Sequence, residues 1–210
     1  DEEDLRLARH YADRTLVLDP DSPDHLVIRG LLEVTGGNGV RGWRIIEAAL
    51  ARDPYHHEAL FWSPAISGFF GRHREASTRW EQLRRADPLH PMIDVFPVWF
   101  EIKIGRFAAA RDQAVRVRQR IERDPLLECA YATALFETGD VARAITVFRE
   151  AYGTRRDLFA RAARALGSSL EGDAPSVVAQ LDGEFERWAR KDFQYSEWAA
   201  DALAQAGEPE

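Results

Sequence analysis

Apolar residues recur at three- and four-residue steps along most of the chain, in short stretches that glycine or proline interrupts. In residues 128–152, Leu135 belongs to an apolar face before Gly139, and Ala144 and Phe148 share a face after it. Such spacing predicts two short amphipathic helices. Gly139 marks the turn between them, because glycine adopts the left-handed backbone conformation without steric cost.

This arrangement recurs with a period of 34 residues. Glycines stand in one phase, with Gly172 a single residue out of step, at Gly37, Gly71, Gly105, Gly139 and Gly207. Prolines give a second register, each after an aspartate and also 34 residues apart, at Pro20, Pro54 and Pro88. Two independent registers with the same period predict an array of helix-turn-helix units.

The unit resembles the tetratricopeptide repeat, which carries glycine at its turn, then alanine, an aromatic residue and a second alanine. Gly139, Ala144, Phe148 and Ala151 hold these places, while Arg156 stands where the family has a closing proline. The resemblance implies an all-α fold, a right-handed superhelix of antiparallel helix pairs. It also implies a binding function, because such arrays present extended concave surfaces.

The repeat phase predicts a single helical-repeat domain over residues 1–210. We expect a half unit, five units and a terminal helix, at residues 1–22, about 23–56, 57–90, 91–124, 125–158 and 159–192, and 193–210. Pro64 and Pro97 fall inside first helices, where they either kink the helix or mark its start. The late Pro125 predicts a second helix about one turn longer in the third unit, and residues 175–188 predict one helix in the fifth.

Composition narrows the function classes. A net charge of -7 argues against nucleic-acid binding, and the sequence has no apolar run long enough to cross a membrane. The single cysteine, Cys129, precludes an internal disulfide and fits a reducing, cytoplasmic location. The sequence does not begin with methionine, so we expect it to be part of a longer protein.

No motif for catalysis is present: the sequence lacks a phosphate-binding loop, a nucleophile elbow and zinc-spaced Cys or His clusters. We therefore expect no catalytic residues, no cofactor and no metal, and we predict that the protein is not an enzyme. His56, His57 and His90 are expected to be ordinary histidines of turn regions. An arginine run on the second helix of the third unit predicts a solvated outer face or, alternatively, a docking patch for an acidic partner: Arg111, Arg116, Arg118, Arg120 and Arg123.

In the family that this sequence resembles, first helices build the inner wall and carry most ligand contacts. The positions that correspond here are mainly apolar and form our candidate groove: Val27, Leu31, Phe61, Phe69, Met92, Val95, Trp99, Ile102 and Phe136. They lack the Lys, Asn and Arg residues with which some members of that family bind the acidic tails of chaperones. A groove of this kind predicts binding of a peptide, a helix or a hydrophobic tail; the alternative is that these side chains pack on each other.

A narrower resemblance concerns the ADPLHP junction and the closing stretch KDFQYSEWAADALAQAGEPE. Both are similar to arrays at the C-terminal end of bacterial multidomain signalling proteins, which implies a sensing or scaffolding role. The expected partner is a protein or peptide. Two alternatives stay open, a self-association module that forms a homodimer and an enzyme built on helical repeats.

Overall fold

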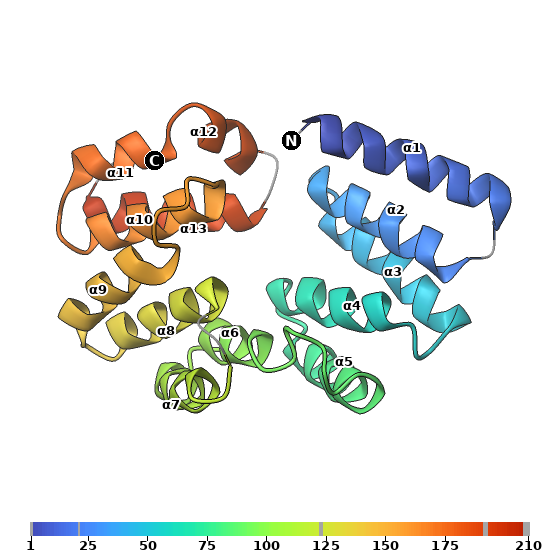
Figure 1. Cartoon of the computed structure of the whole chain (residues 1–210), viewed down its shortest axis with the longest axis horizontal. Coiled ribbons are helices and arrows are strands. Elements are labelled where there is room, and N and C mark those ends of the chain that lie inside the picture. Colours follow the sequence, from blue (N-terminus) through green and yellow to red (C-terminus); the bar gives the residue numbers. More distant parts are fainter. Residues whose placement is uncertain (1, 21, 122–123, 191–192, 208–210) are drawn as a thin grey trace. The chain divides into compact units, whose positions relative to one another are not determined.

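The computed structural model describes residues 2–20, 22–121, 124–190 and 193–207. These residues form thirteen α-helices and contain no strand, so the expected all-α fold is confirmed. The chain divides into two compact units, Asp1–Ile93 and Asp94–Glu210, which run from blue to green and from green to red in Figure 1. Two compact units are compatible with one repeat array, so the single domain stays a prediction.

The first unit holds five helices: α1 (Glu2–Leu18), α2 (Pro23–Thr35), α3 (Gly39–Arg52), α4 (His57–Phe69) and α5 (His73–Ala86). The pairs α2/α3 and α4/α5 pack along their lengths, and the first helices of the two pairs, α2 and α4, also touch. Fully buried side chains join the pairs into one core, among them Ile46, Leu60 and Leu83.

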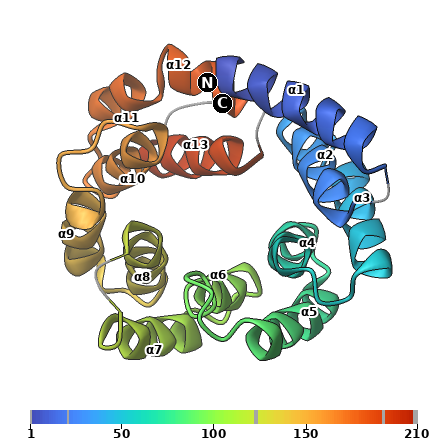
Figure 2. The ribbon, with the colours of Figure 1, turned by 45° about the vertical axis from the view of Figure 1, so that its right-hand side comes forward.

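The second unit holds the remaining helices: α6 (Phe96–Lys103), α7 (Phe107–Arg118), α8 (Pro125–Glu137), α9 (Val141–Ala151), α10 (Leu158–Ser169), α11 (Ala174–Leu181), α12 (Glu184–Ala189) and α13 (Phe193–Ala206). Within this unit, α6, α8, α10 and α13 lie on one face, called the inner face below. α7, α9 and α11 lie on the opposite face, called the outer face (Figure 2). α13 packs against α10, α11 and α12.

The periodic glycines end the first helix of each pair in one conformation. Their φ angles are positive, at 84° for Gly37, 91° for Gly139 and 73° for the out-of-step Gly172. After Gly139, the amide of Asp140 donates to the carbonyl of Leu135 at 2.9 Å. The same five-residue hydrogen bond follows the glycines at 37, 71, 105 and 172. It is the closing bond of the Schellman motif, which requires the left-handed residue that glycine supplies. The predicted turns are confirmed.

The periodic Asp-Pro dipeptides lie in the connections between successive helix pairs. The carboxylates of Asp53 and Asp87 accept hydrogen bonds from backbone amides two residues later, those of Tyr55 at 3.0 Å and Leu89 at 3.2 Å. Such Asx turns satisfy amides that have left one helix and not yet entered the next.

Of the two alternatives for the prolines, each occurs once. Pro97 lies at the start of α6, which begins at Phe96, whereas Pro64 lies inside α4. Two other local expectations were wrong. α7 ends at Arg118 and is shorter than α3 and α5, so the late Pro125 follows extra connecting residues and not an added helical turn. The helix expected over residues 175–188 is interrupted between α11 and α12, where Gly183 has a φ of 60°.

Candidate functional site

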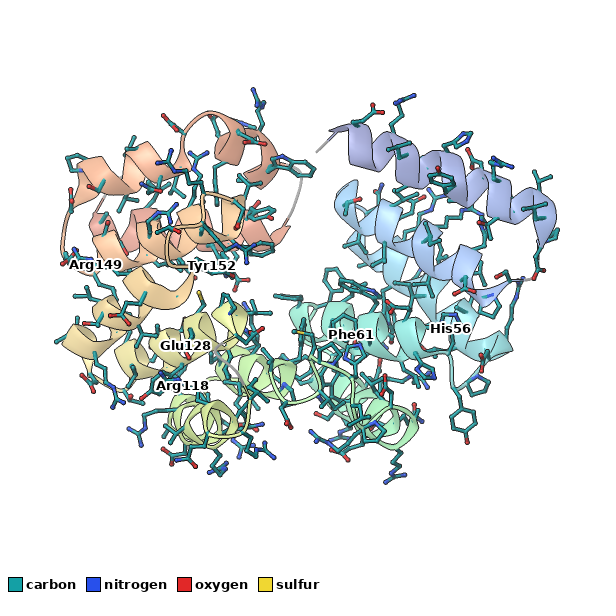
Figure 3. All side chains as sticks on the ribbon, in the orientation of Figure 1. His56, Phe61, Arg118, Glu128, Arg149 and Tyr152 are labelled. Carbon is teal, nitrogen blue, oxygen red and sulfur yellow. The ribbon has the colours of Figure 1, made fainter. Side chains whose placement is uncertain are left out.

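Two of the five candidate groove residues of the first unit belong to its core. Val27 and Phe61 are buried, while Leu31, Phe69 and Met92 are half-buried. The ring of Phe61, labelled in Figure 3, stacks on His90 with ring centroids 4.6 Å apart. It also meets Trp62 edge to face at 4.8 Å. Phe61 therefore fills space between α4 and the residues that follow α5, and the first unit presents only part of the expected apolar wall.

In the second unit, three candidate residues come together. Val95 is fully buried, but Trp99 and Ile102 on α6 and Phe136 on α8 are half-buried and line one pocket of about 150 Å³. Residues of α7, α9, α10 and α13 complete its walls. This cavity, called the inner pocket below, is the candidate functional site.

The closing wall of the inner pocket is α13, whose part in the site the sequence did not predict. Trp198 on α13 is 5% exposed, and its ring stacks on Trp99 with centroids 6.2 Å apart and planes at 26°. Trp198 also meets Phe159 on α10 edge to face at 5.6 Å. Glu197, Asp201 and Gln205 recur at four-residue steps on α13 and line the pocket as well. This spacing in the sequence predicts that the three polar side chains share one face of the helix. It does not predict which other helix that face contacts.

The pocket has a charged side. Lys103 at the end of α6 forms an ion pair with Glu197, and Glu137 and Asp201 line the pocket beside them. The pKa of Asp201 is raised, first by partial desolvation of its carboxyl and then by the charge of Glu197, with Glu137 adding to the effect and Lys103 opposing it. Within the described residues, neither Asp201 nor Glu137 has an ion-pair partner.

Other polar atoms around the pocket are mostly satisfied. The hydroxyl of Thr133 donates to the carbonyl of Cys129 at 3.0 Å, and the hydroxyl of Ser169 donates to the side-chain oxygen of Gln205 at 3.0 Å. Trp99 differs, because its indole Nε1–H is buried and has no hydrogen-bond partner in the described part of the chain. Buried donors normally have a partner, so this indole is an exception.

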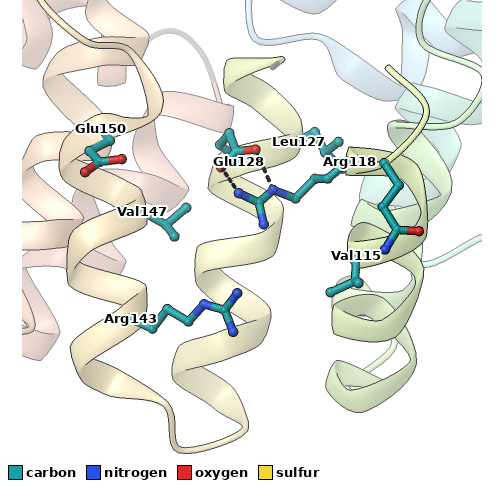
Figure 4. A pocket seen from close by; sticks show the side chains of 8 residues that line it. Val115, Arg118, Leu127, Glu128, Arg143, Val147 and Glu150 are labelled. Carbon is teal, nitrogen blue, oxygen red and sulfur yellow. Dashed lines mark hydrogen bonds and ion pairs between the residues drawn. The ribbon is translucent and has the colours of Figure 1, made fainter. Parts of the chain in front are cut away.

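The outer face of the second unit carries the arginine run and a second pocket of about 460 Å³, shown in Figure 4. Arg118 donates two hydrogen bonds to the carboxylate of Glu128, at 2.7 and 3.1 Å, and its guanidinium lies 4.4 Å from the ring centroid of Tyr131. Glu128 is 1% exposed. Arg118 thus neutralises a buried carboxylate, and it is not a free docking residue.

Two of the four remaining arginines also have acidic neighbours. Arg120 pairs with Asp94 at 3.3 Å and Arg111 with Asp112 at 2.9 Å. Arg116 is exposed on α7, and Arg123 lies outside the described residues. These contacts favour a solvated outer face over an acidic-partner patch.

The histidines have structural contacts. His56 precedes α4 and accepts a hydrogen bond from the amide of Ala59 at 3.3 Å, while its other ring nitrogen lies 3.0 Å from Asp24. His57 lies 3.6 Å from Asp87. Across the described ranges, no group of three or more His, Cys, Asp or Glu side chains is placed to hold a metal ion.

Potential nucleophiles lie in the core. Cys129 is buried in α8, and desolvation raises the pKa of its thiol far above the ordinary value. Burial likewise raises the pKa of the Tyr152 hydroxyl. Neither group ionises near neutral pH, so neither offers an activated nucleophile. Among the helices that the structure describes, none is long and apolar enough to cross a membrane.

No protein-family model matches the sequence, and no curated protein matches it. Solved structures do resemble the fold. A tetratricopeptide repeat protein from Parabacteroides merdae superposes with a TM-score of 0.73 at 14% identity, covering 96% of this chain and 79% of its own. A thermophilic TPR protein in Thermus thermophilus gives 0.67 at 16% identity, covering 87% and 100%.

A third similar structure is a chain of the APC/C hetero-tetramer Cut9-Hcn1, with a TM-score of 0.70 at 14% identity, covering 100% of this chain and 44% of that one. At such identities the likeness concerns the fold and not the activity. Together with the glycine turns, this likeness confirms the predicted architecture: the chain has an all-α solenoid fold of helix pairs like that of tetratricopeptide-repeat proteins.

Proposed function

We propose that this chain is a non-enzymatic protein-interaction module whose second unit binds a segment of a partner at the inner pocket. The observation that carries the proposal is the convergence of Trp99, Ile102 and Phe136 on one cavity. Half-buried aromatic residues around a concave site are typical anchors for a partner side chain. The segment is a peptide, a helix or a hydrophobic tail.

Two further observations support this function. Some of the structural neighbours act in assemblies or bind peptides, such as Cut9 with Hcn1 and a TPR protein described by its unusual peptide-binding site. The groups with the largest pKa shifts, Cys129 and Tyr152, are buried rather than convergent on a cleft, which favours binding over catalysis. A sensing or scaffolding role in a larger bacterial signalling protein, in the cytoplasm, is part of the same proposal.

The test is affinity capture from the source lysate with three forms of the chain. Phe136→Glu places a charge on the half-buried wall of the pocket, and Val178→Glu places the same charge on an exposed position of α11. We expect the wild type and Val178→Glu to retain a partner that Phe136→Glu loses, with all three folded by circular dichroism. Equal capture by the three forms, or no capture by any, would contradict the proposal.

A second candidate function is self-association, which the exposed apolar residues of α1 favour. Val17 and Leu18 are 82% and 80% exposed, and Tyr11 is 59% exposed. Large apolar side chains that are exposed to water can be buried by a second copy of the chain. Light scattering would then show a doubled mass that the double variant Val17→Glu, Leu18→Glu returns to that of a monomer.

A further inference from the structure

The inner pocket combines aromatic walls with an excess of negative charge. Trp99, Trp198 and Phe136 supply rings, while Glu137, Glu197 and Asp201 supply three carboxylates. Among the described residues that line the pocket, Lys103 is the single basic one. It forms an ion pair with Glu197, so one positive charge faces three carboxylates. A ligand with a carboxylate or phosphate at this place would meet repulsion, so the electrostatics select a cation.

The aromatic walls favour the same ligand class. Trp99, Phe136 and Trp198 all line the pocket, and aromatic rings, tryptophan above all, attract ammonium and guanidinium groups. Rings also cover apolar surface, so a cation that carries an aliphatic stem satisfies both parts of the pocket. A bare metal ion would leave the rings in contact with water.

The cavity is large enough to hold more than a single water. Its volume of about 150 Å³ is well above the roughly 10–15 Å³ that a single water needs. A narrow chain of a few heavy atoms fits such a space.

We propose that the inner pocket takes one basic side chain, lysine or arginine, from a peptide partner. The aliphatic stem lies along Trp99, Phe136 and Trp198, and the cationic head meets Asp201 and Glu137. This inference rests on the proposed function and names the chemistry that the site selects. It predicts that basic peptides bind and that acidic peptides do not.

The experiment follows the indole N–H resonances of the ¹⁵N-labelled chain by NMR, with Trp99 assigned through Trp99→Phe. The probes are the N-acetyl methylamides of lysine, arginine, norleucine and glutamate, of which norleucine keeps the lysine stem without the charge. We expect saturable shifts at Trp99 and Trp198 with lysine or arginine. Norleucine should bind more weakly by a factor of about ten or more. Equal responses to lysine and norleucine, or no response at Trp99 to either basic probe, would overturn the proposal.

Isosteric variants test which carboxylates attract the cationic probe. The double variant Asp201→Asn, Glu137→Gln removes the carboxylates of these two residues without changing side-chain size, and Asp112→Asn removes an exposed carboxylate of α7 outside the pocket. We expect the lysine response to disappear in the double variant and to persist in Asp112→Asn. Wild-type lysine binding by the double variant, with an otherwise unchanged spectrum, would refute the assignment.

The two proposals fail separately. Capture of a partner that depends on Phe136, together with equal responses to lysine and norleucine, would leave the interaction module in place and remove the basic-side-chain specificity. A charge-dependent lysine response without any captured partner would support the pocket chemistry and count against the wider function.

Discussion

The indole of Trp99 on α6 stacks on the indole of Trp198 on α13, with ring centroids 6.2 Å apart. The two residues lie on helices that belong to different repeat units. Near them, the ion pair between Lys103 and Glu197 ties the same two helices. α13 thereby becomes a wall of the inner pocket.

Replacing Trp198 with alanine is expected to loosen α13. Truncation of a buried tryptophan costs roughly 3–5 kcal/mol of unfolding free energy, which urea denaturation measures. Hydrogen exchange should show faster exchange in α6 as well as in α13, since the stacking partner is lost. Trp188→Ala on α12, outside the pocket, serves as the control and should leave α6 unchanged. Unaltered protection of α6 in Trp198→Ala would show that the stacking does not hold the two helices together.

The pair Arg118 and Glu128 gives a second prediction. Arg118→Met leaves the buried carboxylate of Glu128 without its partner, at a cost of about 3 kcal/mol, the lower end for a buried pair because Arg118 is part-exposed. Adding Glu128→Met should restore most of the stability, because no buried charge then remains. A double-mutant cycle in urea measures the coupling. Additive losses from the two substitutions would contradict the prediction.

α2 and α3 cross closely because Gly30 on α2 and Gly42 on α3 have no side chains. A Cβ atom at Gly42 would lie 2.4 Å from the carbonyl oxygen of Gly30, so the backbone must move. We expect Gly42→Ala to destabilise the chain by about 1–3 kcal/mol, as measured by thermal unfolding. Gly167→Ala in α10, where the nearest atom would be 3.3 Å away, is the control and should change stability little. Equal effects of the two substitutions would refute the close crossing.

Asp201 predicts a pH dependence. Its pKa is raised in the folded chain above the ordinary value of 3.8, so the folded state binds the proton more tightly than the unfolded state does. Ionised Asp201 therefore lowers stability, and the loss develops as pH rises from about 3.8 through the raised pKa. The facing groups are Glu197 on α13, Glu137 on α8 and Lys103 on α6.

The matching substitution is Asp201→Asn. Its melting temperature should exceed that of the wild type at neutral pH, and the difference should shrink as pH falls toward 3.8. Binding of the lysine probe should weaken in the wild type over the same range, because protonation removes the charge that holds the cation. A melting temperature at neutral pH that is equal or lower in Asp201→Asn would contradict this account.

The sequence alone determined the local geometry of the chain. Glycines at a fixed period predict positive φ angles because other residues are strained there, and the described glycines in that phase, together with the out-of-step Gly172, adopt them. The apolar periodicity likewise predicted the order of the helices. It could not separate α11 from α12, since Gly183 falls between two apolar stretches that continue the same stripe.

The tertiary structure decided which apolar residues remain accessible. Phe61 and Trp99 are both aromatic residues at candidate groove positions of first helices. Phe61 nevertheless packs into a core against His90, whereas Trp99 lines a pocket. The contact between α6 and α13 depends on the sum of many small rotations between successive helices, and a sequence pattern fixes each helix face without fixing that sum. The glycine turns were therefore predictable from the chain, whereas the inner pocket exists only because folding brings Trp198, Glu197 and Asp201 to Trp99.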